Sequence, residues 1–272
     1  MRVANVETNS MEQVASALRS PERLQSPVLK PACARLCEGD IPIAELGPIL
    51  IASPHPDDET LGCGGLISRC AELGCSVTIL AMTKGEASHP GDRHWQTRLA
   101  QIRGAEQRRA LNVMGFSDPD IIELGLPDGG LESLSTETLQ RACVKIREII
   151  HSRRIQTLFV PAVDDCHADH QITAKLLADV ARDYPFRYFF SYQIWLPTSR
   201  RLSVTTNERE YGHDISSLIA LKRSAIFQHQ SQLNVVDPNH TEGFRMPPTL
   251  LDAKLGNTES FALVSDPAAW SS

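Results

Sequence analysis

The stretch Pro48-Ile-Leu-Ile-Ala-Ser53 is followed directly by Pro54-His-Pro-Asp-Asp-Glu59. The first half is a short apolar run, which is typical of a β-strand buried on both faces of a sheet. The second half contains one imidazole and three carboxylates. A helix N-terminus would account for Asp58 and Glu59, but it would not account for a histidine held between two prolines. The stretch therefore predicts a buried strand that ends at a rigid turn, and this turn carries an imidazole and carboxylates of the kind found in metal sites.

Strand-like and helix-like segments alternate outward from this turn. The expected strands cover 48–53, 75–82, 120–124, 157–161 and 186–195. The expected helices cover 62–73, 96–114, 136–152, 169–183 and 216–228, and the tail after residue 230 is expected to be irregular. Alternation at this spacing predicts βαβ units with right-handed crossovers. We therefore expect an α/β, Rossmann-like fold, with a mostly parallel sheet and helices on both faces.

Length and charge limit the domain organisation and the function class. The chain has 272 residues, with 27 basic and 33 acidic side chains and a net charge of −6. We expect an N-terminal extension over 1–45 and a single domain over 46–272. The slight negative charge gives no general attraction to nucleic acid. No window approaches the roughly 20 apolar residues that cross a bilayer.

Cysteine usage and the first residues of the chain bear on location and assembly. The seven cysteines are an odd number and are scattered, which suits a reducing compartment. The first 20 residues lack the apolar core of a signal peptide. The sequence therefore predicts a cytoplasmic protein. The extension is open to two roles, covering a sheet edge or mediating homo-oligomer formation.

A second polar cluster, Asp164-Asp-Cys-His-Ala-Asp-His170, follows the expected strand at 157–161. His167 and His170 are three residues apart, so they project to similar sides of a first helical turn. Loops at the carboxyl ends of parallel strands meet at one edge of a sheet, so this cluster should lie beside the first. Together the clusters supply His, Asp and His as three metal ligands. A fourth position is left for water, as in catalytic zinc sites.

The run from Pro54 to Gly65 resembles the signature of the PIG-L/LmbE family of zinc-dependent, N-acetylglucosaminyl-type deacetylases. His167-Ala-Asp-His170 is similar to the second motif of that family. Four further segments fit its pattern in order, namely Thr83–Glu86, Arg103–Glu106, Leu126–Gly129 and Lys222–Gln232. The ordered set is much more specific than any single motif.

The resemblance implies a metal site and a set of catalytic residues. The ligands of a zinc ion, or of another divalent metal such as Fe²⁺, would be His55, Asp58 and His170. Spacing alone leaves open which of two adjacent aspartates binds metal and which takes a proton.

By the same resemblance, Asp57 would be the general base that takes a proton from the attacking water. His167, as an imidazolium, would stabilise the oxyanion and protonate the leaving amine. Asp169 would orient or charge-tune His167.

The resemblance also implies that Glu86, Arg103 and Asp128 line a sugar pocket. For Arg103 the alternative is a surface ion pair with Glu106, three residues along a helix. For Asp128 the alternative is turn chemistry within Pro127-Asp-Gly-Gly130. Both alternatives stay open at the level of the sequence.

The implied function is an amidohydrolase that removes an N-acetyl or other N-acyl group from an amino sugar or an amino-sugar-containing small molecule. The alternative is a non-catalytic regulatory protein of the same fold that binds metal or sugar. A dinucleotide-binding role for Gly62-x-Gly64-Gly65 is disfavoured, because its spacing does not fit the glycine fingerprint and acidic residues precede it. We expect these glycines to allow a helix to pack closely on the sheet.

Overall fold

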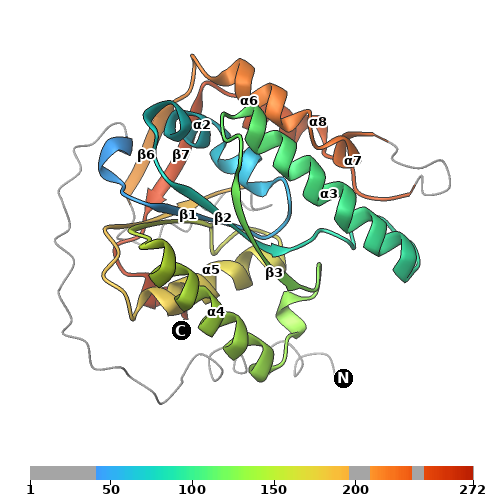
Figure 1. Ribbon diagram of the computed structural model, residues 1–272, viewed down its shortest axis with the longest axis horizontal. Coiled ribbons are helices and arrows are strands. Elements are labelled where there is room, and N and C mark those ends of the chain that lie inside the picture. Colours follow the sequence, from blue (N-terminus) through green and yellow to red (C-terminus); the bar gives the residue numbers. More distant parts are fainter. Residues whose placement is uncertain (1–40, 196–208, 235–241, 272) are drawn as a thin grey trace, which may run out of the picture.

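The computed structural model describes residues 41–195, 209–234 and 242–271 (Figure 1). Most of the expected N-terminal extension lies outside the described residues. Ile41 and Ile43 are buried in the apolar core, so packing of the domain begins before residue 46. Within the described residues, no helix is both long and apolar enough to span a bilayer.

The described residues form one sheet of seven strands in the order β3-β2-β1-β4-β5-β7-β6. The strands are β1 (Ile49–Ser53), β2 (Val77–Thr83), β3 (Asp120–Leu126), β4 (Thr157–Pro161), β5 (Tyr188–Tyr192), β6 (Arg209–Asp214) and β7 (Thr258–Leu263). The strands β1 to β5 pair in parallel, whereas β7 is antiparallel to both β5 and β6. The predicted α/β fold with a mostly parallel sheet is confirmed.

Helices cover both faces of the sheet (Figure 1). They are α2 (Asp58–Leu73), α3 (Arg93–Val113), α4 (Thr136–Arg153), α5 (Ala168–Ala181), α6 (Ile219–Ile226), α7 (Gln230–Leu233) and α8 (Pro248–Lys254), with short 3₁₀ turns η1 (Ile43–Glu45), η2 (Leu131–Ser133) and η3 (Pro267–Ser271). The helices α4 and α5 lie on one face, and α2, α3 and α6 lie on the other. Each face buries its own apolar core, which explains why the central strands are continuously apolar.

The expectation of an irregular C-terminal tail was wrong. The segment after residue 230 contains α7, α8 and β7, and β6 was also not expected. In β7 the buried and exposed residues alternate, with Phe261 and Leu263 facing inward. In β6 only Tyr211 and His213 are buried. Such short, half-buried strands carry a weaker sequence signal than a continuous apolar run.

Two glycines of α2 lie where a side chain would collide with a neighbouring element. A Cβ atom on Gly62 would lie 2.4 Å from the ring of Tyr192, and one on Gly65 would lie 2.2 Å from Ile215. The expectation that the glycines allow close packing is confirmed.

A buried carboxylate ties α2 to the C-terminal strands. Glu259 on β7 accepts hydrogen bonds from the backbone N–H groups of Gly65 (2.7 Å) and Leu66 (2.8 Å), and it forms a buried ion pair with Lys222 (2.7 Å). These contacts fix the helix that begins at the His-Asp turn. The turn is therefore held on a rigid support.

Candidate active site

Three ligand-type atoms from two loops form a nearly equilateral triangle. His55 Nδ1 lies 3.2 Å from Asp58 Oδ2 and 3.3 Å from His170 Nε2, and the remaining side of the triangle is 3.2 Å. Ligand bonds of about 2.0–2.1 Å with tetrahedral angles place the ligand atoms about 3.3 Å apart. The triangle therefore has the size of one face of a tetrahedron around a zinc ion, and the donor set fits that metal.

The local sequence explains how these atoms meet. Asp58 is the first residue of α2, directly after the turn that follows β1. His170 lies in the first turn of α5, which follows β4, and β1 and β4 are hydrogen-bonded neighbours in the sheet. Pro54 and Pro56 restrict the backbone around His55. The two predicted clusters are therefore brought together at one edge of the sheet.

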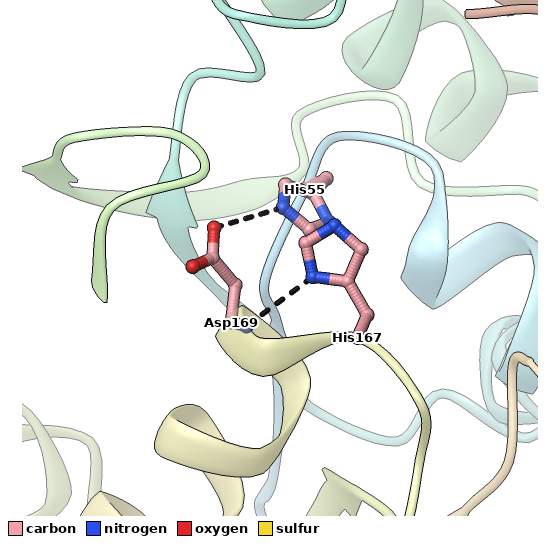
Figure 2. A group of neighbouring side chains, drawn as sticks. All are labelled: His55, His167 and Asp169. Carbon is pink, nitrogen blue, oxygen red and sulfur yellow. Dashed lines mark hydrogen bonds and ion pairs between the residues drawn. The ribbon is translucent and has the colours of Figure 1, made fainter. Parts of the chain in front are cut away.

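The second nitrogen of each histidine faces a carboxylate. His55 Nε2 lies 3.2 Å from Asp169 Oδ2, as Figure 2 shows, and 3.2 Å from Asp128 Oδ1. His170 Nδ1 lies 3.2 Å from Asp165 Oδ2. A carboxylate partner favours a proton on the nitrogen that faces it. The other nitrogen of each ring, the one in the triangle, then presents a lone pair for a metal.

The carboxylates give the site a preference for positive charge. Burial acts against a charged imidazole, yet hydrogen bonds with carboxylates, that of Asp128 foremost, raise the pKa of His55 well above its ordinary value. Burial also acts against a charged His170, but Asp58 and Asp165 raise its pKa to about 9. Burial opposes ionisation of Asp58 as well, but His170 and His55 hold its pKa well below the usual range. A divalent cation satisfies this preference by displacing protons.

His167 lies beside the triangle. It caps the N-terminus of α5, and its Nδ1 accepts a hydrogen bond from the backbone N–H of Asp169 at 3.2 Å (Figure 2). Its ring centroid lies 4.7 Å from that of His55. Burial, together with the charges of His55 and His170, lowers the pKa of His167. These effects favour the neutral ring, whereas the resemblance implied an imidazolium.

Asp169 differs in part from its expected role. Its carboxylate faces His55 rather than His167, and it accepts hydrogen bonds from the backbone N–H groups of Gly129 (2.8 Å) and Leu131 (3.1 Å). Its charge acts to raise the pKa of His167. Asp169 thus orients His55 by its side chain and His167 by its backbone.

Asp57 adopts a strained backbone next to the triangle. It precedes α2 with φ of 146°, a region that residues other than glycine rarely adopt and that is associated with functional sites. Burial raises the pKa of Asp57 to about 8, although the nearby Arg103 guanidinium opposes this shift. Arg103 Nη2 lies 3.2 Å from Asp57 Oδ2.

Arg103 is a buried residue that joins two loops. It donates hydrogen bonds to the carbonyl oxygens of Gly85 and Pro56, both at 2.9 Å. The alternative of a surface ion pair with Glu106 was wrong, because Arg103 is 3% exposed. The guanidinium holds the turn and the Asp57 carboxylate in place.

The carboxylates of Asp128 and Glu86 also contact other groups of the protein. Asp128 Oδ2 accepts a hydrogen bond from the backbone N–H of Ala87 (2.7 Å), and its other oxygen faces His55. Glu86 Oε1 accepts one from the backbone N–H of Asp128 (3.3 Å). The role of Glu86, Arg103 and Asp128 in substrate binding stays a prediction.

A cavity of about 290 Å³ opens over the triangle. Five of the loops that follow the parallel strands contribute to it. Its lining residues are His55, Asp57, Asp58, Leu61, Ala87, Ser88, Arg103, Asp128, Gly129, His167, Ile194, Trp195, Gln232, Phe244, Met246 and Leu250. The candidate site therefore includes catalytic-type side chains, backbone groups and an apolar wall.

Sequence reasoning missed Asp165 as a site residue. Asp165 is fully buried, and its carboxylate accepts hydrogen bonds from the backbone N–H groups of His167 (3.0 Å), Ile194 (3.2 Å) and Trp195 (3.0 Å). The same carboxylate faces His170. Two adjacent aspartates precede the His-x-Asp-His motif, and the pattern does not separate them.

We expect Asp165→Asn to weaken zinc binding by about 10–100-fold, because loss of the partner of a ligating histidine typically has this effect. The measurement is competition for zinc with a chromophoric chelator. Asp164→Asn is the matched control, since this half-buried neighbour lies one residue away and should leave the zinc affinity unchanged. Equal zinc affinities of the two variants would contradict the role of Asp165.

Residues 50–181 match the family profile described as PIG-L, GlcNAc-PI de-N-acetylase. The chain is 28% identical over 193 residues to the "Probable N-acetyl-alpha-D-glucosaminyl L-malate deacetylase 2" of Bacillus anthracis, covering 68% of this chain and 80% of that protein. It is also 28% identical over 165 residues to the "1D-myo-inositol 2-acetamido-2-deoxy-alpha-D-glucopyranoside deacetylase" of Kineococcus radiotolerans, covering 50% and 46% of the two chains.

A solved structure has the same fold. It is the N,N'-diacetylchitobiose deacetylase from Pyrococcus horikoshii, which aligns with a TM-score of 0.62 and 20% sequence identity. The alignment covers 84% of this chain and 87% of that chain. The likeness supports the fold, while the family assignment rests on the sequence matches.

Proposed function

Because the chain belongs to the PIG-L/LmbE family of GlcNAc-type deacetylases, we propose that it is a zinc-dependent hydrolase that removes an N-acetyl or other N-acyl group from an amino sugar or from a small molecule that contains one. The observation that carries the proposal is the triangle of donor atoms next to the cavity, which His55, Asp58, Asp57 and His167 line. The names of the relatives support N-acetylglucosaminyl compounds as the substrate class.

His55, Asp58 and His170 would hold the metal through the three atoms of the triangle. A zinc ion bound there supplies Lewis-acid chemistry, which makes water more acidic and polarises an amide carbonyl. Asp128 and Asp169 face the second nitrogen of His55, and Asp165 faces that of His170, so these carboxylates hold the ligating rings in the required tautomers. The ligand geometry is therefore set in advance by protein groups.

Asp57 is the proposed general base. Its carboxylate lines the cavity, and a pKa of about 8 suits proton transfer near neutral pH. Arg103 fixes the carboxylate through the contact at 3.2 Å. Asp57 takes a proton from the attacking water and then delivers that proton to the leaving amine nitrogen. Asp57 therefore ends the reaction in the protonation state in which it began.

His167 is the proposed oxyanion stabiliser. Because its Nδ1 accepts the N–H of Asp169, the proton of the neutral ring is on Nε2. The Nε2–H group can therefore donate a hydrogen bond to the carbonyl oxygen as negative charge develops on it. Such a donor in a partly buried site strengthens as the charge develops.

The test is acetate release together with metal content. Purified protein should contain about one zinc ion per chain, as expected for a site with three protein ligands. It should release acetate from at least one of N-acetylglucosaminyl malate, N-acetylglucosaminyl inositol and diacetylchitobiose. Chelation should abolish the release, and added zinc should restore it. Bound zinc with no cleavage of a wide N-acyl panel would instead favour the non-catalytic binding protein.

A further inference from the structure

The cavity is lined by two chemically different groups of side chains. One group, His55, Asp57, Asp58 and His167, accounts for the proposed chemistry. The remaining lining includes six apolar side chains, namely Leu61, Ile194, Trp195, Phe244, Met246 and Leu250. We call these six residues the apolar wall. Hydrolysis of an acetamide by the groups described above does not require a wall of this size.

The apolar wall is held in place by hydrogen bonds to the rest of the cavity. The backbone N–H of Phe244 donates to the carbonyl of Ser88 (2.8 Å), and that of Met246 donates to the carbonyl of Gln232 (2.7 Å). The rings of Trp195 and Phe244 pack edge to face, with centroids 5.8 Å apart and an interplanar angle of 82°. The wall is therefore formed before any ligand binds.

The apolar wall begins next to the metal ligands. Ile194 and Trp195 donate their backbone N–H groups to the Asp165 carboxylate, which also faces His170. Leu61 lies one turn along α2 from Asp58. An amide carbonyl that reaches the triangle therefore has apolar side chains of this wall as neighbours.

The cavity lining also contains a buried polar acceptor. Gln232 is buried and lines the cavity, and its Oε1 has no hydrogen-bond partner in the described part of the chain. A buried acceptor without a partner carries a free-energy cost that a ligand O–H group would remove. The cavity thus matches a molecule with a polar ring and an apolar substituent.

We propose that the preferred substrates are N-acyl amino sugars that carry an apolar group, either an aromatic or alkyl aglycone or an acyl chain longer than acetyl, which packs against the apolar wall. This inference rests on the proposed function and deepens it by adding the chemical class of the substituent. Four of the six side chains are already buried, but Trp195 and Phe244 are half-buried, so an apolar group packed against these two rings removes apolar surface from water.

The test uses two matched substrate pairs with the zinc-loaded full chain. The first pair is the methyl and phenyl glycosides of N-acetylglucosamine, and the second is the N-acetyl and N-hexanoyl forms of methyl glucosaminide. We expect kcat/KM to be at least about tenfold higher for the apolar member of one pair, which corresponds to about 1.4 kcal/mol. The pair that responds identifies the aglycone or the acyl chain as the apolar group.

Phe244→Ala should lower that preference about fivefold, which removal of one aromatic contact of about 1 kcal/mol would produce. Phe227→Ala is the matched control, because Phe227 is 49% exposed and should leave the preference unchanged. A ratio near one in both substrate pairs would overturn the inference, and so would an equal effect of the two phenylalanine substitutions.

Binding separates this inference from the proposed function. Calorimetric titration of Asp57→Asn protein with the same four compounds measures affinity without turnover. Tighter binding of the apolar member, with no acetate or hexanoate release by the unsubstituted protein, would support the apolar wall and contradict the hydrolase. Release of acyl groups with equal affinities and equal kcat/KM values would support the hydrolase and contradict the apolar wall.

Discussion

Replacing Asp57 with asparagine is expected to lower kcat by about 10²–10⁴-fold, the usual contribution of a positioned general base. The side-chain amide of the asparagine cannot take the proton of the attacking water or return it to the leaving nitrogen. The zinc content should not change, since Asp57 Oδ2 faces Arg103 and the triangle contains Asp58 instead. Steady-state acetate release and metal content per chain are the two measurements.

Asp92→Asn is a matched control for this experiment. Asp92 also immediately precedes a helix, but it is exposed and its side chain accepts the N–H of Trp95 (2.8 Å). Asparagine preserves that cap, so kcat should stay at the level of the unsubstituted protein. An Asp57→Asn variant that keeps its zinc and retains full kcat would rule out Asp57 as the base.

Replacing His170 with alanine is expected to weaken zinc binding by about 10²–10³-fold. An apparent binding free energy of about 10–16 kcal/mol shared among four ligands is about 2.5–4 kcal/mol for each. Acetate release should fall in proportion to the bound zinc. Elemental analysis of dialysed protein measures the loss.

Two further variants separate loss of the ligand from loss of the fold. His170 is fully buried, so alanine also leaves a cavity, whereas His170→Gln keeps more of the side-chain volume and should lose zinc as well. His151→Ala replaces an exposed histidine on α4 and should retain zinc. Full zinc content in a folded His170→Gln protein would mean that the triangle is not the metal site.

The parallel half of the fold was predictable from local patterns. The segments that became β1 to β5 are apolar runs separated by helix-length segments, and that alternation permits few topologies. The start of α2 was predicted four residues too late, because the acidic residues at 58 and 59 were taken with the turn rather than the helix. The strands β6 and β7 were missed, because each buries only one face and pairs with a partner distant in sequence.

The residue types of the site were also predictable. The two His/Asp clusters each follow a buried strand. Loops at the carboxyl ends of parallel strands meet at one edge of the sheet, so both clusters were expected there. The structure brings His55, Asp58 and His170 together as that argument requires. Which of the adjacent aspartates lies in the triangle could not be obtained from their spacing.

The sequence alone was enough to predict the strands and helices of the parallel part of the fold and the proximity of two polar clusters, because burial and periodicity are visible in short stretches of chain. Only the tertiary structure decided which atoms meet. It placed Asp169 against His55, Arg103 against Asp57 and Asp165 behind His170. These contacts join residues on different loops, and their distances depend on how the helices pack on the sheet. No spacing along the chain contains that information.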